Sequence, residues 1–354
     1  MASEFEQWVS SAAHGLNDGS MAADDVLPRL VEAGHVSAGV PASMGGAGGD
    51  ITDAVAAVAT VARSSLAAAF MLWGHRAYVE YLLQSPNRPL LERDLSKLLS
   101  GEVAGATGLS NAMKFLAGME ALQIRARSID GGRLALDGKM PWVTNLKPAR
   151  FHVAAAVERA DGGPAFVASL AHDDRNLTRL PDLDLMAMRS TDTAAIILED
   201  VAIGPDRILA DNAVEWLPQV RPAFLGLQCG MSIGLARRSL SEAGSAAGAG
   251  RAVLTAPLAD LCRRLDRAEG LLLRGLRDRS FELKAPPLFE IRIELAEIVA
   301  EAVALELEAL GGRAYLREPG RDYARRLQES AFIPVITPSL VQLKSALEKL
   351  RYAA

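Results

Sequence analysis

Residues 138–145 read GKMPWVTN, and this stretch places an aromatic ring and a hydroxyl two positions apart. On a β-strand, successive side chains point to opposite faces, so Trp142 and Thr144 lie on the same face. Just before it, residues 123–129 alternate polar and apolar side chains, and an Asp-Gly-Gly turn leads into residues 133–136. This pattern predicts a β-hairpin next to the strand that carries Trp142.

Strand patterns of this kind continue through the middle of the chain. Residues 151–157 and 165–170 flank a second Asp-Gly-Gly turn, and residues 193–198 form a further strand pattern. Helix-length segments do not alternate with these strands, which argues against a doubly wound parallel sheet. We therefore expect an antiparallel β-barrel or sandwich in the middle of the chain.

Helical periodicity lies on both sides of this block. Apolar residues recur every three or four positions up to about residue 100, apart from the glycine-rich segment 40–50, and again from about residue 213. The pattern predicts an α+β chain with an N-terminal helical domain (1–100), a central β domain (101–210) and a C-terminal four-helix bundle (211–354). We expect the four bundle helices at residues 215–244, 256–282, 287–310 and 322–350.

The composition of the 354-residue chain narrows the class of protein. Apolar residues make up 50% and charged residues 23%, as in a globular protein of two or three domains. The net charge of −5 and the lack of a basic stripe argue against a nucleic-acid binder. The most apolar region, residues 51–73, contains Asp53 and Arg63, so we expect no membrane span.

Cysteine and histidine usage argues against a metal centre. The two cysteines lie far apart and the five histidines are scattered, so none of them has metal-ligand spacing. The N-terminus lacks the basic start and apolar stretch of a secretory signal. Together these features favour a cytoplasmic protein with reduced thiols.

The order of the three blocks, together with several separated motifs, resembles the acyl-CoA dehydrogenase superfamily of flavoproteins. The resemblance covers nearly the whole chain. It rests on Gly39-Val40-Pro41 with the glycine-rich loop to Asp50, on the stretch 138–145, on Met188-Arg189-Ser190-Thr191 with Leu198-Glu199-Asp200-Val201 and Pro205, on Ala259-Asp260-Leu261, and on Leu310-Gly311-Gly312.

This resemblance implies an oxidoreductase with bound FAD. In the family a carboxylate removes the α-proton of an acyl thioester, and the β-hydride passes to the flavin. The family's motifs assign Trp142 to packing beside the flavin ring, Thr144 to a hydrogen bond near its N5 edge, and Leu109 and Ser110 to a first β-strand that contacts the pyrimidine end. The alternative for Trp142 is core packing, and for Thr144 an ordinary strand position.

The family's phosphate-binding motif is altered here. The family usually has Arg-x-x-Phe-Gly between the first two bundle helices, whereas residues 244–251 lack Phe-Gly and offer Arg251. The usual glutamine before the glycine pair is Glu308, which would repel a pyrophosphate. Gly311 and Gly312 would still allow close backbone approach to a cofactor, unless they serve only to stop a helix.

The family's catalytic glutamate is absent from both positions where it occurs. By the resemblance these positions are Ile336, before the last helix, and Val220, just before Arg221. Neither side chain can accept a proton. His75 is a candidate base on an apolar helix, with a structural role as its alternative. Arg221 is a candidate substrate contact that can equally brace the bundle.

Three functions remain open at this stage. The first is an FAD-dependent oxidoreductase that acts at the CH–CH group of an acyl thioester, such as an acyl-CoA, or of a related small substrate. The second is a flavin-dependent monooxygenase of the same fold, which needs no glutamate base. The third is a non-catalytic homologue that acts as a subunit partner. The resemblance also implies a homodimer or homotetramer built through the C-terminal bundle.

Overall fold

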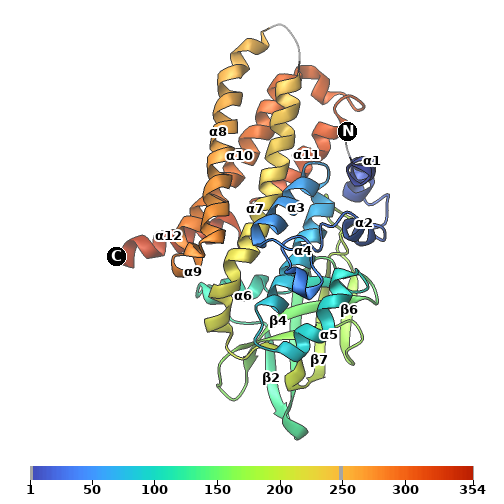
Figure 1. The fold of residues 1–354 in the computed structure, drawn as a ribbon, viewed down its shortest axis with the longest axis vertical. Helices are drawn as coiled ribbons and strands as arrows, with labels where there is room; N and C mark the ends of the chain where they lie inside the picture. Colours follow the sequence, from blue (N-terminus) through green and yellow to red (C-terminus); the bar gives the residue numbers. More distant parts are fainter. Residues whose placement is uncertain (1–2, 247–249, 354) are drawn as a thin grey trace.

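The computed structural model describes residues 3–246 and 250–353. Three groups of elements follow one another along the chain, in the order that the sequence predicts. In Figure 1 the long bundle helices α7, α8 and α10 run along the longest axis, the N-terminal helices pack beside them, and the strands lie at the lower end. Among the described residues, none of the helices is long and apolar enough to cross a membrane.

The N-terminal group contains the most deeply buried helix of the chain. Asp50 caps α3 with its side chain, and Ser65 caps α4 in the same way, so the apolar region 51–73 forms two helices. Nearly every side chain of α4 is buried, because the other helices and the sheet surround it. The helices of this group are α1 (Glu4–Asp18), α2 (Val26–Glu32), α3 (Ile51–Ala62), α4 (Leu66–Leu83) and α5 (Arg88–Leu99).

The central sheet is mixed. Most neighbouring strands are antiparallel, as expected, but β1 and β2 each pair with β4 in parallel. Long connections separate these partners in sequence, so the hairpin constraint that forces antiparallel pairing does not apply to them. The strand order is β6-β7-β3-β2-β4-β5-β8, with β1 beside β4. The strands are β1 (Ala104–Thr107), β2 (Ile124–Ile129), β3 (Arg133–Val143), β4 (Phe151–Arg159), β5 (Phe166–Ala171), β6 (Leu177–Asp182), β7 (Ala194–Ile203) and β8 (Ile208–Ala210), and helix α6 (Ser110–Leu116) follows β1.

The C-terminal group differs from the expected four-helix bundle in its last member. The predicted helix 322–350 is two helices, because Pro334 and Pro338 interrupt the intervening segment and a proline cannot continue the backbone ladder. α12 leads away from the bundle toward the C-terminus (Figure 1). The helices are α7 (Ala213–Ser245), α8 (Thr255–Arg277), α9 (Ser280–Leu283), α10 (Pro286–Leu310), α11 (Arg321–Phe332) and α12 (Leu340–Ala353), and short 3₁₀ turns lie at Ala42–Met44, Asp130–Gly132, Pro205–Arg207, Arg251–Leu254 and Gly311–Tyr315.

Two glycines on α7 allow it to pack closely against α3. A Cβ atom on Gly230 would lie 2.8 Å from the carbonyl oxygen of Val55, and one on Gly234 would overlap the carbonyl oxygen of Ala59. The two positions are one turn apart, so they form a flat stripe that faces the α3 backbone. This contact joins the N-terminal helices to the bundle.

We expect Gly234→Ala to lower the free energy of unfolding by about 1–3 kcal/mol, because the added methyl group forces the two helix backbones apart. Urea unfolding followed by circular dichroism measures this change. Gly270→Ala in α8 is the matched control, since its nearest neighbour, an Arg274 nitrogen, lies 3.5 Å away. This control should gain up to about 1 kcal/mol through helix propensity, and equal losses in both variants would contradict the packing argument.

Candidate functional site

A cavity of about 440 Å³ lies where the sheet, α4 and the segment after α11 meet. Its wall is formed mainly by aromatic and aliphatic side chains, with hydroxyl groups on the side of the sheet. Both Trp142 and Thr144 contribute to it, as does Ile336. The full lining is Phe70, Trp73, Thr107, Ser110, Lys114, Trp142, Thr144, Leu185, Met186, Ala187, Met188, Thr193, Gln328, Ala331, Phe332, Val335, Ile336 and Thr337.

Trp142 and Thr144, two positions apart in the sequence, both line the cavity. Trp142 lies near the end of β3 and is 62% exposed, so it is not core packing. Thr144 directly follows β3 and is buried. This arrangement agrees with the prediction that the two side chains share a face, and it leaves the indole ring free to cover a ligand.

Thr144 belongs to a chain of three buried hydroxyls. Its Oγ1 lies 2.5 Å from Oγ1 of Thr193, which lies 2.7 Å from Oγ1 of Thr191. Thr191 in turn donates to the carbonyl oxygen of Met188 at 2.9 Å. A carbonyl can only accept and each hydroxyl has one proton, so Thr193 donates to Thr191, and Thr144 donates either to Thr193 or to the Thr191 carbonyl oxygen at 3.4 Å. Thr144 is thereby left with acceptor lone pairs at the cavity wall.

A second network fixes an amide donor elsewhere in the cavity wall. The backbone N–H of Met188 donates to Oδ1 of Asn17 at 3.0 Å, and Nδ2 of Asn17 donates to Oε1 of Gln328 at 2.8 Å. A backbone N–H can only donate, so this contact sets the orientation of both amides. The Nε2 group of Gln328 therefore remains as the donor available to the cavity.

Aromatic rings close the cavity against the interface between α4 and α7. Phe70 and Trp73 stack with ring centroids 5.3 Å apart, and Phe332 meets Phe70 edge-on at 4.7 Å. The indole N–H of Trp73 donates to the carbonyl oxygen of Phe224, whose ring lies 5.2 Å away. These contacts hold the rings in place and exclude water from this end.

The cavity wall contains one charged side chain and no carboxylate among the described residues. The charged group is Lys114. Ile336 contributes an aliphatic side chain, and Val220 is buried in α7 and does not line the cavity. Glu329, on the neighbouring helix α11, accepts the backbone N–H of Leu66 and pairs with Arg325, so its carboxylate is used within the protein.

His75 has no place in the cavity wall. It is fully buried in α4; its Nε2 lies 3.1 Å from the Leu98 carbonyl and its Nδ1 accepts the backbone N–H of Gly105 at 3.1 Å. Burial and the adjacent Arg76 lower the pKa of His75 to about 3, so the ring stays neutral. Both ring nitrogens therefore connect α4 to neighbouring segments. This contact pattern favours the structural role of His75 over the role of a base.

Arg221 likewise lies outside the cavity lining. Its guanidinium group packs over the ring of Phe289 at 5.5 Å from the centroid, which joins α7 to α10. Burial lowers the pKa of this arginine. This contact favours the bracing role over a substrate contact.

The predicted strand position of Leu109 and Ser110 is wrong. β1 ends at Thr107, Leu109 precedes α6, and Ser110 is the first residue of that helix. Gly108 lies between Thr107 and Leu109 and has no room for a side chain, because a Cβ atom there would lie 2.7 Å from the Ala154 carbonyl oxygen. Ser110 nevertheless lines the cavity, whereas Leu109 is fully buried.

The predicted phosphate residues gather elsewhere, around the end of α10 that leads to Gly311. Nε of Arg251 donates to the Ala309 carbonyl at 2.6 Å, and its guanidinium group lies against Gly311. Glu308 and Gly312 are exposed beside them. None of the four lines the cavity, so within one chain they form a separate surface. The loop residues 247–249 of this motif lie outside the described residues.

Several cavity residues were not predicted. Thr193, Gln328 and Phe332 come from three further segments, and only packing brings them to Trp142. The position of Thr193 could have been predicted, since Thr191 and Thr193 repeat the two-residue spacing of Trp142 and Thr144 in an adjacent strand region. Gln328 and Phe332 lie one turn apart on α11, but many residue pairs share that spacing.

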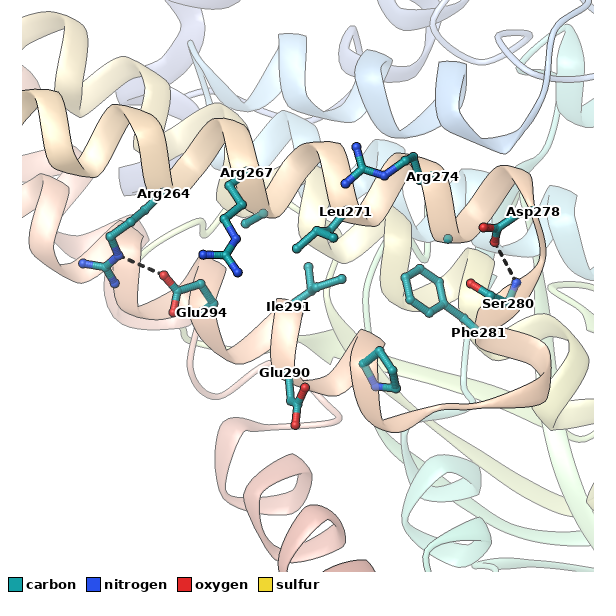
Figure 2. Close-up of a pocket in the computed structure, with 13 residues that line it drawn as sticks. Arg264, Arg267, Leu271, Arg274, Asp278, Ser280, Phe281, Glu290, Ile291 and Glu294 are labelled. Carbon is teal, nitrogen blue, oxygen red and sulfur yellow. Dashed lines mark hydrogen bonds and ion pairs between the residues drawn. The ribbon is translucent and has the colours of Figure 1, made fainter.

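A second hollow, of about 570 Å³, lies between α8 and α10 (Figure 2). Arg264 and Arg267 on α8 point toward Glu294 near the start of α10, and Arg264 pairs with Glu294. Arg274 and Glu290 line the same hollow farther along the two helices. None of the predicted site residues lines this hollow, and its walls are open to solvent. We therefore assign the candidate site to the cavity beside Trp142.

The buried neutral state of His75 predicts a pH-dependent stability. Between pH 6.5 and about 4 the unfolded chain protonates this histidine and the folded chain does not, so stability falls as the pH falls. The expected contribution is about 1.4 kcal/mol per pH unit. Urea unfolding across this range should give a slope smaller by that amount in His75→Leu than in the parent. His75→Gln removes the same imidazole with a polar replacement and should show the same smaller slope, and a slope equal to that of the parent in both variants would contradict the assignment.

Comparisons with known proteins agree with the resemblance. Residues 4–102 match the family model described as the acyl-CoA dehydrogenase N-terminal domain. The probable acyl-CoA dehydrogenase YngJ of Bacillus subtilis is 25% identical over 315 residues, which span 82% of this chain and 80% of that protein.

Solved structures share the fold over the whole chain. Butyryl-CoA dehydrogenase from Megasphaera elsdenii superposes with a TM-score of 0.80 at 17% identity and covers 99% of both chains. KijD3, solved in complex with FMN and dTDP-3-amino-2,3,6-trideoxy-4-keto-3-methyl-D-glucose, has a TM-score of 0.81 at 20% identity, over 99% of this chain and 91% of that one. The chain thus carries an acyl-CoA dehydrogenase N-terminal domain and has the acyl-CoA dehydrogenase fold throughout.

Proposed function

We propose that this protein is a flavin-dependent oxidoreductase that acts on an acyl thioester or a related small substrate. The observation that carries the proposal is the cavity bounded by Trp142, the Thr144–Thr193 hydroxyl chain and the aromatic wall. Its relatives of the same fold include enzymes named for acyl-CoA substrates and one solved with FMN. Cavities of a few hundred Å³ with few, convergent polar groups are typical of cofactor and substrate sites.

The donor set of the cavity fits a flavin ring. An isoalloxazine is flat and apolar on its faces, and its edge carries both hydrogen-bond donors and acceptors. Trp142 offers a face for stacking, Thr144 offers an acceptor, and Gln328 offers a donor on another wall. FAD, the cofactor that the resemblance implies, and FMN have the same ring, so the ring site supports a flavin without choosing between them.

A bound flavin would supply two-electron transfer to or from the substrate. The described residues would contribute orientation and exclusion of water. Trp142 would fix the plane of the ring, and Thr144 would hold an edge N–H through its free lone pairs. Phe70, Trp73 and Phe332 keep water from the inner end, which strengthens each polar contact inside.

The lack of a carboxylate in the lining favours a second candidate function. Abstraction of an α-proton needs a base within hydrogen-bond reach, and no described residue of the wall is a carboxylate or a histidine. A flavin-dependent monooxygenase that uses reduced flavin and O₂ has no such requirement. We therefore keep monooxygenation as the alternative reading of the same cavity.

We also propose a homodimer or homotetramer. The surface around Gly311 exposes large apolar side chains that a monomer would leave in water, such as Tyr315 at 94% and Val253 at 75% exposure. By the resemblance, the motif between the first two bundle helices, which here includes Arg251, serves the cofactor of a neighbouring subunit. Size-exclusion chromatography with light scattering measures the oligomeric state directly.

The first experiment is an absorbance scan of the purified protein before and after adding a flavin. We expect a bound-flavin band near 450 nm, and we expect Trp142→Ala to weaken flavin binding by about tenfold through loss of stacking area. Trp142→Phe keeps an aromatic face and is the matched control, with a smaller loss. A protein that stays colourless in excess FAD and FMN would overturn the flavoenzyme proposal and favour the non-catalytic homologue.

Ile336→Glu tests whether the cavity lacks only a base. Because Ile336 lines the cavity, a carboxylate at this position should raise butyryl-CoA-dependent dye reduction by at least about tenfold over the parent. Ile336→Gln matches the size and polarity of the new side chain without its basicity. If both variants stay as inactive as the parent, the dehydrogenation reading loses its support, and NAD(P)H-linked oxygenation with reduced flavin becomes the assay to pursue.

A further inference from the structure

The two polar networks of the cavity meet at the backbone of Met188. Its carbonyl oxygen accepts Oγ1 of Thr191 at 2.9 Å, and its N–H donates to Oδ1 of Asn17 at 3.0 Å. Met188 has a left-handed backbone with a φ of 53°, which is uncommon for a residue other than glycine. Asn17 is buried, and its backbone carbonyl also accepts the N–H of Arg189 at 3.1 Å. The end of α1 therefore fixes the backbone of the segment that lines the cavity around Met188.

Gln328 is the group through which this backbone contact acts on the cavity. Asn17 presents only its Nδ2 group to Gln328, because its Oδ1 is held by the N–H of Met188. Nδ2 of Asn17 donates to Oε1 of Gln328 at 2.8 Å, which leaves the two N–H donors on Nε2 of Gln328. Among the residues that the structure describes, none accepts a hydrogen bond from this Nε2 group. Gln328 thus offers the cavity a neutral donor whose orientation is set from α1.

This donor lies at a different end of the cavity from three other polar side chains of the wall. Ser110, Lys114 and Trp142 also line a smaller hollow of about 90 Å³ beside α6, whereas neither Gln328 nor Met188 does. Gln328 comes from α11 and reaches the cavity beside the Met188 segment. A flavin ring that stacks on Trp142 lies toward the α6 end. The amide of Gln328 is then available to the ligand that lies beside the ring.

We propose that Gln328 binds the carbonyl oxygen of the acyl substrate, and that Asn17 is the positioning residue that keeps Gln328 a donor. The inference rests on the proposed function and adds a residue that recognises the substrate. A carbonyl oxygen can only accept hydrogen bonds, so it fits the Nε2 group and not the Oε1 atom that the reversed amide would present. The hydrogen bond also stabilises negative charge that develops on this oxygen during the reaction.

Two ligands that differ only in the carbonyl group test the role of Gln328. Butyryl-CoA contains the thioester carbonyl, and S-butyl-CoA has a methylene group in its place. In the flavin-loaded protein we expect Gln328→Leu to weaken butyryl-CoA binding by about three- to tenfold, the value of one neutral hydrogen bond, and to leave S-butyl-CoA binding nearly unchanged. Gln219→Leu is the matched control, because Gln219 lies on α7 outside the cavity lining, and it should affect neither ligand. Isothermal titration calorimetry measures both affinities.

Asn17→Asp tests the positioning role, because it replaces a donor by a second acceptor of the same size. An ionised carboxylate at this position can still accept the N–H of Met188, but it also accepts Nε2 of Gln328 and turns Oε1 of Gln328 toward the cavity. We expect butyryl-CoA binding to weaken as it does in Gln328→Leu. Infrared difference spectra of butyryl-CoA labelled at the carbonyl carbon should show the C=O band at a lower frequency in the parent than in either variant. A merely structural role would weaken both ligands and leave this band unmoved.

The outcomes separate this inference from the proposed function. If Gln328→Leu changes the two ligand affinities equally or not at all, Gln328 does not bind the carbonyl and the proposal is overturned, although flavin binding stands. If this variant weakens the binding of FMN and FAD instead, the donor serves a carbonyl of the flavin ring, which also overturns the proposal. A flavin-loaded protein that binds neither CoA ligand overturns the assignment to a thioester carbonyl. A protein that binds no flavin contradicts the proposed function itself. Circular dichroism melts confirm that the variants remain folded.

Discussion

The candidate site depends on one buried cation, Arg292 of α10, which holds the broken end of the bundle in place. Its Nη2 donates to the carbonyl oxygen of Ile333 at 2.7 Å, and its Nε faces Oε1 of Gln228 at 3.5 Å. Nε2 of Gln228 in turn donates to the Thr337 carbonyl at 2.7 Å. Burial lowers the pKa of Arg292, and no carboxylate pairs with it among the described residues. Backbone carbonyls that the helix break leaves free thus take the place of a carboxylate partner for Arg292. The segment 333–339, to which these carbonyls belong, contributes Val335, Ile336 and Thr337 to the cavity wall.

The sequence predicts the parts of this molecule that local periodicity controls. The alternation up to Ile129 and the two-residue spacing of Trp142 and Thr144 give the strands and one face of the cavity. Helical periodicity gives three of the four long bundle helices to within a few residues. The prediction of a fourth long helix is wrong because amphipathic spacing continues on both sides of residues 333–339. The two prolines in this segment interrupt the helix although the apolar pattern does not change.

The rest of the site could not be predicted because it is made by packing between distant segments. Gln328 becomes a defined donor only because Asn17, more than three hundred residues earlier, takes up its carbonyl. The acceptor character of Thr144 depends on Met188, the last group in the hydroxyl chain. Similarly, no local pattern shows that both ring nitrogens of His75 meet backbone groups of other segments. Motif resemblance locates residues, whereas their protonation and donor roles follow from contacts that only the fold creates.

The charges of the site set the strongest constraint on its chemistry. Among the residues that the structure describes, the cavity wall has one lysine and no carboxylate, and Phe70, Trp73 and Phe332 close its inner end. Such a wall stabilises negative charge on a bound ligand and offers no carboxylate to take up a proton. A base introduced at Ile336 would be desolvated, which raises its pKa and makes it a better proton acceptor near neutral pH. The missing base disfavours α-proton abstraction, whereas the positive charge of Lys114 favours ligands that carry phosphate or that gain electrons. Electron transfer to a bound flavin therefore requires less of this cavity than proton transfer does, and the identity of the proton acceptor is the feature that separates a dehydrogenase from an oxygenase on this scaffold.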